Sequence, residues 1–131
     1  MRIMLDTNVL VSAIIFPNER MDTLIYKSTL ENQLVLSSYI IDELLGITER
    51  KFPEKVKHVD TFLTRLPFEL VYTPQEPDYN LFYIRDKKDY SALYSAITEG
   101  IDLFITGDAD FAEVEIEKPE IITPSEFLEK Y

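Results

Sequence analysis

The sequence contains no cysteine. Disulfide bonds, thiolate nucleophiles and zinc sites with sulfur ligands are therefore excluded, and we expect a protein of the reducing cytoplasm. No apolar run approaches the roughly 18 residues that a membrane-spanning helix needs, so we expect no membrane partner. Because Asp6 and Asn8 interrupt the apolar stretch at residues 1–16, and no small-residue cleavage site follows, we do not expect a signal peptide.

Positive charge is scarce, since 13 Lys and Arg stand against 24 Asp and Glu and give a formal net charge of -11. A chain this acidic is not expected to bind nucleic acid through a broad basic surface. If nucleic acid is the ligand, bound divalent cations or a basic partner must offset the acidic charge locally. The simpler explanation is that the surplus acids keep the protein soluble.

Apolar segments of two kinds alternate along the 131 residues, a length that predicts one compact domain spanning 1–131. Short continuous runs predict buried strands, and longer runs with a spacing of three to four residues predict helices. The expected strands are 3–5, 34–36, 68–72, 103–105 and 121–122. The expected helices are 9–16, about 20–31, one capped by Ser37 or Ser38, one from Pro53 to before Pro67, 89–99, and one from Pro124.

This alternation predicts an α/β fold, with a central parallel sheet of about five strands and helices on both faces in three layers. Ligands of such sheets bind beyond the carboxyl ends of the strands. Leu24, Ile25 and Leu30 are expected to be the inward-facing residues of the second helix.

Four acids come from four separate segments that this fold brings to one edge of the sheet. Asp6 follows the first strand and Asp108 follows the fourth. Glu43 lies about one and a half turns into the helix after the second strand, and Asp89 lies in the first turn of the helix before the fourth. We therefore expect these side chains to converge.

Converging carboxylates repel one another unless a cation lies between them. Oxygen ligands without cysteine, and with the single histidine far away in sequence, favour Mg²⁺ or Mn²⁺ over zinc. Such an ion can activate a water molecule and polarise a phosphoryl oxygen, so the cluster suits phosphodiester hydrolysis.

Each acid also has a plain structural explanation. Asp6 can cap the helix that follows it, and Asp89 can interact with a helix dipole. Asp108 and Asp110 can form an Asx turn. An acid on a helix is usually exposed to solvent, and this explanation suits Asp42 better than Glu43, which lies among apolar residues. Together, four acids at one sheet edge are harder to explain as caps.

Four segments resemble the conserved segments of PIN domains. They are the opening strand with Asp6 at residues 3–10, Ser37 followed by Glu43, residues 85–89 before a helix with small residues, and residues 105–111 around Asp108. All four occur in order over a chain of the expected size. Lys87, where a proline is common, and the bulky Tyr90 depart from the pattern without removing an acid.

The resemblance implies a Mg²⁺- or Mn²⁺-dependent endoribonuclease, similar to the VapC-like toxins of toxin–antitoxin pairs. It further implies an RNA substrate, a homodimer and inhibition by a small antitoxin. By matching position, the resemblance assigns catalysis and metal binding to Asp6, Glu43, Asp89 and Asp108. It assigns the role of an accessory metal ligand, which varies in importance, to Asp110, and supporting roles to Asn8, Thr106 and Asp86.

Two alternatives stay open. A Mg²⁺-dependent phosphatase would use Asp6 as the nucleophile, but such enzymes usually carry a second aspartate where this chain has Asn8. The second alternative is a non-catalytic binding module with the PIN fold. The sequence also contains two basic clusters. The first lies beside the proposed site and could guide RNA; it consists of Arg85, Lys87 and Lys88. The second is more typical of plain surface and consists of Arg50, Lys51, Lys55 and Lys57.

Overall fold

The computed structural model describes all 131 residues and contains one five-stranded sheet. The strand order is β3-β2-β1-β4-β5, and every neighbouring pair is parallel. The strands are β1 (Arg2–Leu5), β2 (Gln33–Ser37), β3 (Glu69–Val71), β4 (Leu103–Ile105) and β5 (Glu120–Ile122). The predicted parallel sheet of five strands is confirmed.

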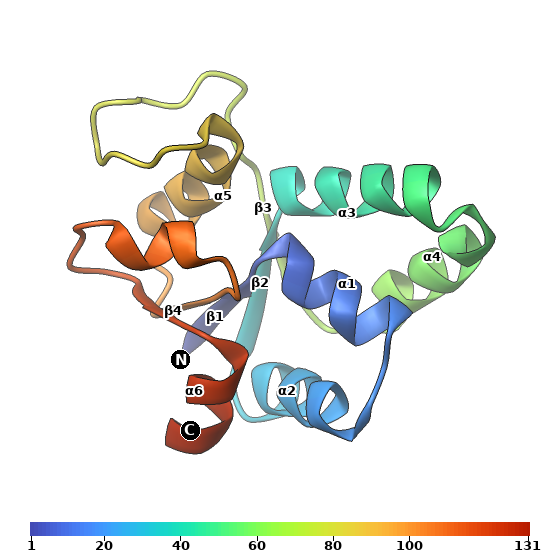
Figure 1. Ribbon diagram of the computed structural model, residues 1–131. Coiled ribbons are helices and arrows are strands. Elements are labelled where there is room, and N and C mark those ends of the chain that lie inside the picture. Colours follow the sequence, from blue (N-terminus) through green and yellow to red (C-terminus); the bar gives the residue numbers. More distant parts are fainter.

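Six helices and two 3₁₀ turns cover the sheet. The helices are α1 (Thr7–Ile15), α2 (Glu19–Leu30), α3 (Ser38–Lys51), α4 (Val56–Arg65), α5 (Lys87–Thr98) and α6 (Pro124–Lys130), and the turns are η1 (Pro53–Lys55) and η2 (Ala109–Glu113). Figure 1 views the sheet nearly edge-on, with α1, α3 and α4 on one face and α5 on the other. The predicted three-layer α/β/α arrangement is therefore confirmed.

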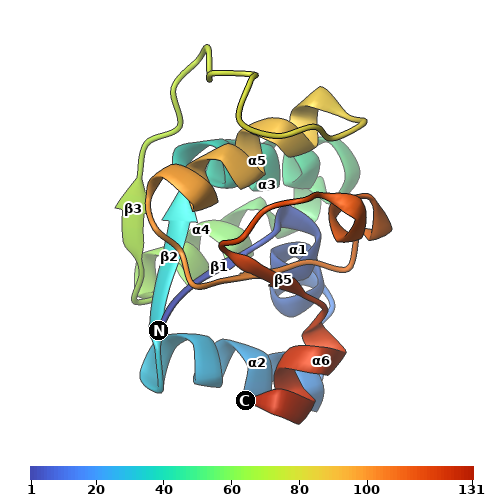
Figure 2. The same cartoon turned by 90° about the vertical axis from the view of Figure 1, so that its left-hand side faces the viewer.

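The two remaining helices, α2 and α6, pack against each other at the end of the molecule opposite the α5 loop (Figure 2). None of the helices combines the length and apolar character that a membrane span would require.

The central strand β1 explains why a run of three apolar residues is enough to define a strand. Ile3, Met4 and Leu5 are fully buried because helices cover both faces of the sheet. They belong to a single cluster of 29 buried hydrophobic residues that extends through all five strands. The register places Leu5 opposite Ile105 of β4, so these two strands end side by side.

Local sequence signals set most helix boundaries. Ser37 caps α3 by accepting a hydrogen bond from the Ile40 N–H at 3.2 Å. Thr123 and Glu126 form a capping box at the start of α6, and Pro124 occupies the first position of the helix. Gly100 follows α5 with φ of +67°, a left-handed conformation that glycine adopts without steric cost.

Three details differ from the sequence-based expectations. The segment from Pro53 forms the 3₁₀ turn η1 before α4 instead of one continuous helix, and η2 was not anticipated because five residues carry no helical period. The inward orientation expected for Leu30 is wrong, since it is 68% exposed. Leu30 follows the buried Ser28 of α2 by two residues, which is about 200° around the helix, so the two side chains lie on opposite faces.

Two glycine-to-alanine substitutions should change stability in opposite directions. Gly100→Ala should lower the free energy of unfolding by about 1–2 kcal/mol, because alanine disfavours a left-handed backbone. Gly46→Ala, in the middle of α3 where an added Cβ meets no atom within 4 Å, should raise it by about 0.5–1 kcal/mol. Urea denaturation of both variants and of the wild type measures this, and a change of the same sign in both would contradict it.

Candidate metal centre

Asp6 lies directly beyond β1 and is 6% exposed. Its Oδ1 accepts a hydrogen bond from the Thr7 N–H at 2.8 Å, and its Oδ2 accepts one from the Thr106 hydroxyl at 2.8 Å. The expected capping role and the expected place in the site thus coincide, because the residue that begins α1 also points its carboxylate toward the end of β4.

Thr106 joins the ends of the two central strands. Its buried hydroxyl donates to Asp6 and accepts a hydrogen bond from the Asp108 N–H at 3.0 Å. Asp108 in turn accepts a hydrogen bond from the Asp110 N–H at 2.9 Å through Oδ1, which begins η2. One hydroxyl therefore fixes the position of the segment that carries two further acids.

Three acids form the most compact part of the cluster. Asp89, Asp108 and Asp110 each offer one carboxylate oxygen, and these oxygens lie within 4.8 Å of one another. All three side chains are only partly buried, so they remain accessible from solvent. Asp89 comes from the first turn of α5, while the other two follow β4, so the contact depends on the packing of α5 against the sheet.

Glu43 lies on α3, is half-buried, and is near enough to Asp6 for its charge to raise the pKa of Asp6. The Tyr39 hydroxyl, one turn earlier on that helix, donates to Glu43 Oε2 at 3.4 Å. Burial and then the Glu43 charge raise the pKa of Tyr39, so this phenol stays protonated and remains a donor. Sequence analysis missed Tyr39, although its spacing of four residues from Glu43 is the helical neighbour distance.

The acids repel one another electrostatically. Burial and, after it, the charges of Asp108, Asp86, Asp6 and Asp110 together raise the pKa of Asp89 to about 7. Burial also raises the pKa of Asp6, against the lowering effect of its hydrogen bonds from Thr106 and Thr7, while the charges of Glu43 and Asp108 add to the increase. The cluster thus behaves as a site that lacks positive charge.

The donor set fits a hard divalent cation. The grouped ligand atoms are carboxylate oxygens, the preferred ligands of Mg²⁺ and Mn²⁺. His58, the only histidine, lies on α4, and its Nε2 is 3.0 Å from the backbone carbonyl of Ile14. Asp89, Asp108 and Asp110 would hold an ion directly. The charge of Asp6 acts on Asp89, and the charge of Glu43 acts on Asp6, so both of these carboxylates lie near the group.

The remaining predicted residues lie around the cluster without equal involvement. Asp86 is exposed and caps α5 by accepting a hydrogen bond from the Lys88 N–H at 3.0 Å, so its local role is structural. Asn8 is exposed at the start of α1, where it lines a shallow hollow with Gly107 and Arg20. Neither side chain joins the three-acid group.

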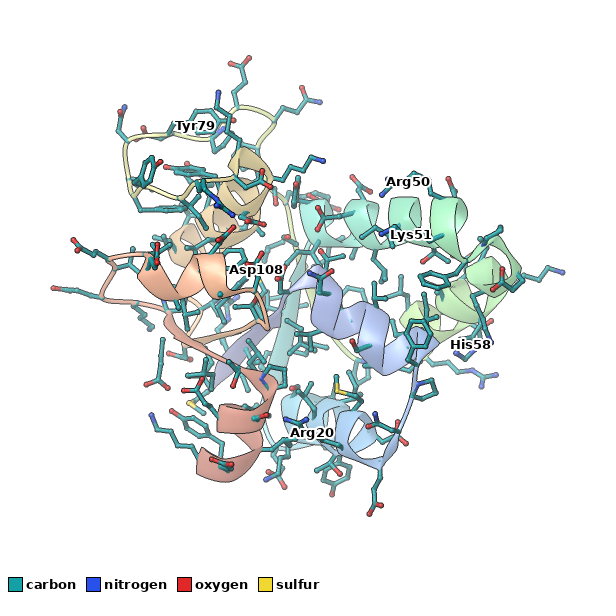
Figure 3. All side chains as sticks on the ribbon, in the orientation of Figure 1. Arg20, Arg50, Lys51, His58, Tyr79 and Asp108 are labelled. Carbon is teal, nitrogen blue, oxygen red and sulfur yellow. The ribbon has the colours of Figure 1, made fainter.

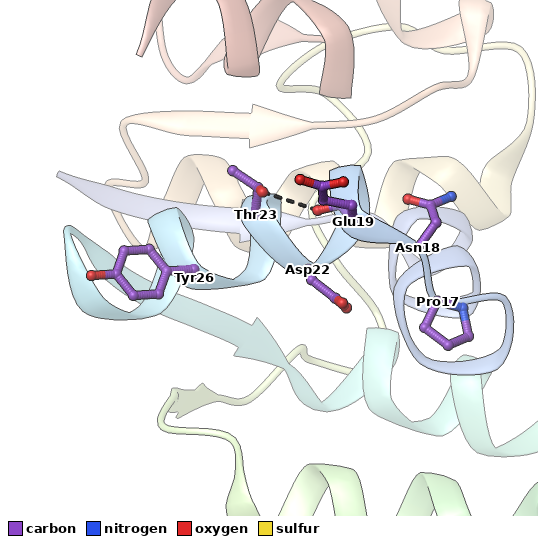
Figure 4. Close-up of a pocket in the computed structure, with 6 residues that line it drawn as sticks. All are labelled: Pro17, Asn18, Glu19, Asp22, Thr23 and Tyr26. Atoms are coloured by element: carbon purple, nitrogen blue, oxygen red, sulfur yellow. Dashed lines mark hydrogen bonds between the residues drawn. The ribbon is translucent and has the colours of Figure 1, made fainter.

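The basic residues separate into a near group and a distant group. Arg85 forms an ion pair with Asp110, with 3.1 Å between Nη2 and Oδ2. Arg50 and Lys51 lie toward the end of α3, away from Asp108 (Figure 3). Another hollow, along α2 and including Tyr26, contains no residue of the acidic cluster (Figure 4).

Removing the Thr106 hydroxyl should destabilise the metal-free protein. Thr106→Val leaves Oδ2 of the buried Asp6 carboxylate without its donor, while Oδ1 keeps the Thr7 N–H, and the loss should cost about 1–3 kcal/mol of unfolding free energy at pH 7. Thr106→Ser should retain most of the wild-type stability because it retains the hydroxyl. Thr98→Val is the matched control, since it loses a hydroxyl hydrogen bond at the exposed end of α5. Equal losses for both valine variants, measured by urea denaturation, would disprove the bridging role.

The raised pKa of Asp89 makes stability depend on pH. Its ordinary pKa of 3.8 in the unfolded chain rises to about 7 in the folded, metal-free protein. The folded state therefore binds the extra proton, and stability should fall as the pH rises from about 4 to about 7. Asp89→Asn should make stability depend less on pH, leaving only the smaller dependence that comes from Asp6. Adding Mn²⁺ at pH 8 should restore the stability that the wild-type protein has lost at this pH. Melting temperatures in chelator across this range test it, and parallel pH profiles for both proteins would rule it out.

Comparison with known proteins supports the same assignment. The family model described as PIN domain matches residues 2–110. The structure is similar to VapBC2 from Rickettsia felis bound to a promoter DNA fragment (TM-score 0.71, 22% identity, covering 93% of this chain and 97% of that chain). It is also similar to VapC20 of Mycobacterium tuberculosis, a sarcin–ricin loop cleaving toxin (TM-score 0.60, 13% identity, 84% and 92% covered). No curated protein sequence matches the chain. The resemblance seen in the four acidic segments is confirmed, and the chain belongs to the PIN domain family.

Proposed function

We propose that this protein is a metal-dependent endoribonuclease that hydrolyses phosphodiester bonds in RNA. The observation that carries this proposal is the group of three acids, Asp89, Asp108 and Asp110, whose carboxylate oxygens lie within 4.8 Å at the carboxyl ends of the strands of a PIN domain. Mutual repulsion at this density favours a bound cation over an empty cluster.

The residues divide into ion-holding and proton-handling groups. Asp89, Asp108 and Asp110 would hold Mg²⁺ or Mn²⁺, with Asp6 as a further ligand oriented by Thr106. When bound, the ion supplies a Lewis acid for the phosphoryl oxygen and a water of lowered pKa. Glu43, half-buried and hydrogen-bonded to Tyr39, would accept a proton at its free Oε1. Asp86 and Asn8 would support the site from its rim.

Net charge is consistent with this assignment. RNA must approach a chain with formal charge -11, and the repulsion is greatest at the acidic cluster. A divalent ion offsets much of this negative charge and places a cation where the scissile phosphate must lie. Metal binding would therefore precede RNA binding.

The cellular role we propose is that of the toxin in a toxin–antitoxin pair. One similar structure is a VapBC2 complex and another is a toxin that cleaves the sarcin–ricin loop. On this basis we expect a cytoplasmic, single-domain protein that forms a homodimer and is inhibited by a small antitoxin.

A phosphatase with Asp6 as nucleophile is less consistent with the geometry. Both Asp6 oxygens accept hydrogen bonds, from the Thr7 N–H and the Thr106 hydroxyl, and the side chain is 6% exposed. These bonds draw electron density from both oxygens, yet each keeps a second lone pair that can ligate a cation. The environment suits a ligand better than an attacking group.

Substitution of one central acid should weaken metal binding and slow cleavage. Asp108→Asn should weaken Mn²⁺ binding at least about tenfold and lower the rate of single-stranded RNA cleavage about 100-fold or more, because it removes a charged ligand. Isothermal titration with Mn²⁺ and a gel-based cleavage assay measure the two effects.

The matched control is Asp42→Asn, which removes an exposed acid from α3 next to Glu43. It should leave both measurements within about twofold of wild type, since exposed charges interact weakly. Hydrolysis of a phosphomonoester without RNA cleavage would favour the phosphatase. Equal Mn²⁺ binding by wild type and Asp108→Asn would refute the carboxylate site.

A further inference from the structure

The segment between β3 and α5 forms an aromatic hollow beside the acidic cluster. The hollow has a volume of about 360 Å³, and its walls include four aromatic rings and two cations. These residues are Tyr79, Phe82, Tyr83, Tyr90, Arg85 and Lys87. Figure 3 shows Tyr79 on this segment above α5, with Asp108 below it near the middle of the view.

The floor of the hollow is closely packed and hydrogen-bonded. Tyr90 is 4% exposed and its ring stacks on Phe82 with centroids 4.0 Å apart and planes 9° apart. The Tyr90 hydroxyl donates to the Asp78 carbonyl and accepts a hydrogen bond from the Leu81 N–H at 3.2 Å. Tyr90, whose bulk departs from the usual pattern, therefore holds the loop in place and has no free face for a ligand.

Tyr83 has the opposite character. It is 83% exposed, more than any other large hydrophobic side chain of the protein. Exposure of a phenol ring on a loop anchored by Tyr90 leaves a flat apolar surface without a protein partner. Such a ring offers a stacking surface to a planar ligand, and every nucleobase has a π face.

The cations connect this hollow to the acidic cluster. Arg85 lines the hollow and also pairs with Asp110, one of the three clustered acids. The Lys87 ammonium lies 5.9 Å from the Tyr79 ring centroid. Because the chain is strongly acidic elsewhere, these two cations mark a favourable place for phosphate next to the site of cleavage.

We infer that the hollow binds one unpaired base of the RNA substrate, next to the scissile phosphate, with Tyr83 stacked on the base. Arg85 and Lys87 contact the flanking phosphates. This inference rests on the proposed ribonuclease function and adds to it the residue that binds one unpaired base of the substrate. A paired base cannot enter, because its face is already stacked within the duplex.

The test compares Tyr83→Ala with wild type in binding a short fluorescein-labelled single-stranded RNA. Anisotropy is measured in Ca²⁺, another ion that carboxylate oxygens bind. Stacking of one base on an aromatic ring predicts an affinity loss of about 5- to 150-fold. In Mn²⁺, KM for cleavage should rise with little change in kcat, because stacking is equal in the ground and transition states.

Three controls sharpen the comparison. Tyr83→Phe should bind like wild type because it keeps the ring, and Tyr26→Ala should also do so because Tyr26 is 55% exposed on α2, away from the site. Tyr83→Trp would place the only tryptophan in the chain at this position, and its fluorescence should be quenched by single-stranded RNA. Circular dichroism confirms that each variant is folded.

Unchanged RNA affinity of Tyr83→Ala, or an equal loss for duplex RNA, would overturn the stacking site, as would a loss of self-association with RNA binding intact. Absence of RNA binding by the wild type would overturn it as well. The two proposals fail separately. Binding that depends on Tyr83 without any cleavage in Mn²⁺ would refute the nuclease alone, and cleavage with binding independent of Tyr83 would refute the stacking site alone.

Discussion

The hydrogen bond from the Thr106 hydroxyl to the Asp6 carboxylate ties together the parts of this protein that matter for its chemistry. It is available only because β1 and β4 are paired in parallel and end at the same level, with Leu5 opposite Ile105. The same hydroxyl accepts from the Asp108 N–H and so directs η2. The alignment of β1 and β4 thus determines where the carboxylates of Asp6, Asp108 and Asp110 lie.

The clustering of carboxylates lowers the stability of the metal-free protein, although the same clustering is what would bind a metal ion. Burial, together with the neighbouring carboxylates, raises the pKa values of Asp89 and Asp6, so ionisation of these two groups opposes folding in the absence of a cation. The 29-residue hydrophobic core supplies the stabilisation that tolerates this repulsion. Strain of this kind is typical of functional sites, where local rules are broken and the rest of the fold compensates.

The same edge of the sheet combines two kinds of surface. The acidic cluster suits a cation, and the neighbouring hollow suits an aromatic, negatively charged ligand. Arg85 belongs to both, since it pairs with Asp110 and lines the hollow. The scarcity of basic residues in the chain therefore does not exclude RNA, because the few cations near the site lie where a phosphate backbone would approach.

Sequence alone determined the parallel α/β fold, because short apolar runs and caps such as Ser37 and Thr123 are local signals. It also placed Asp6 and Asp108 at the strand ends, since parallel strands end at one edge. The tertiary structure alone decided that Asp89 approaches Asp110, and that Tyr90 is buried while Tyr83 is exposed. These outcomes depend on how α5 and its preceding loop pack on the sheet, and no local pattern encodes contacts between segments distant in the chain.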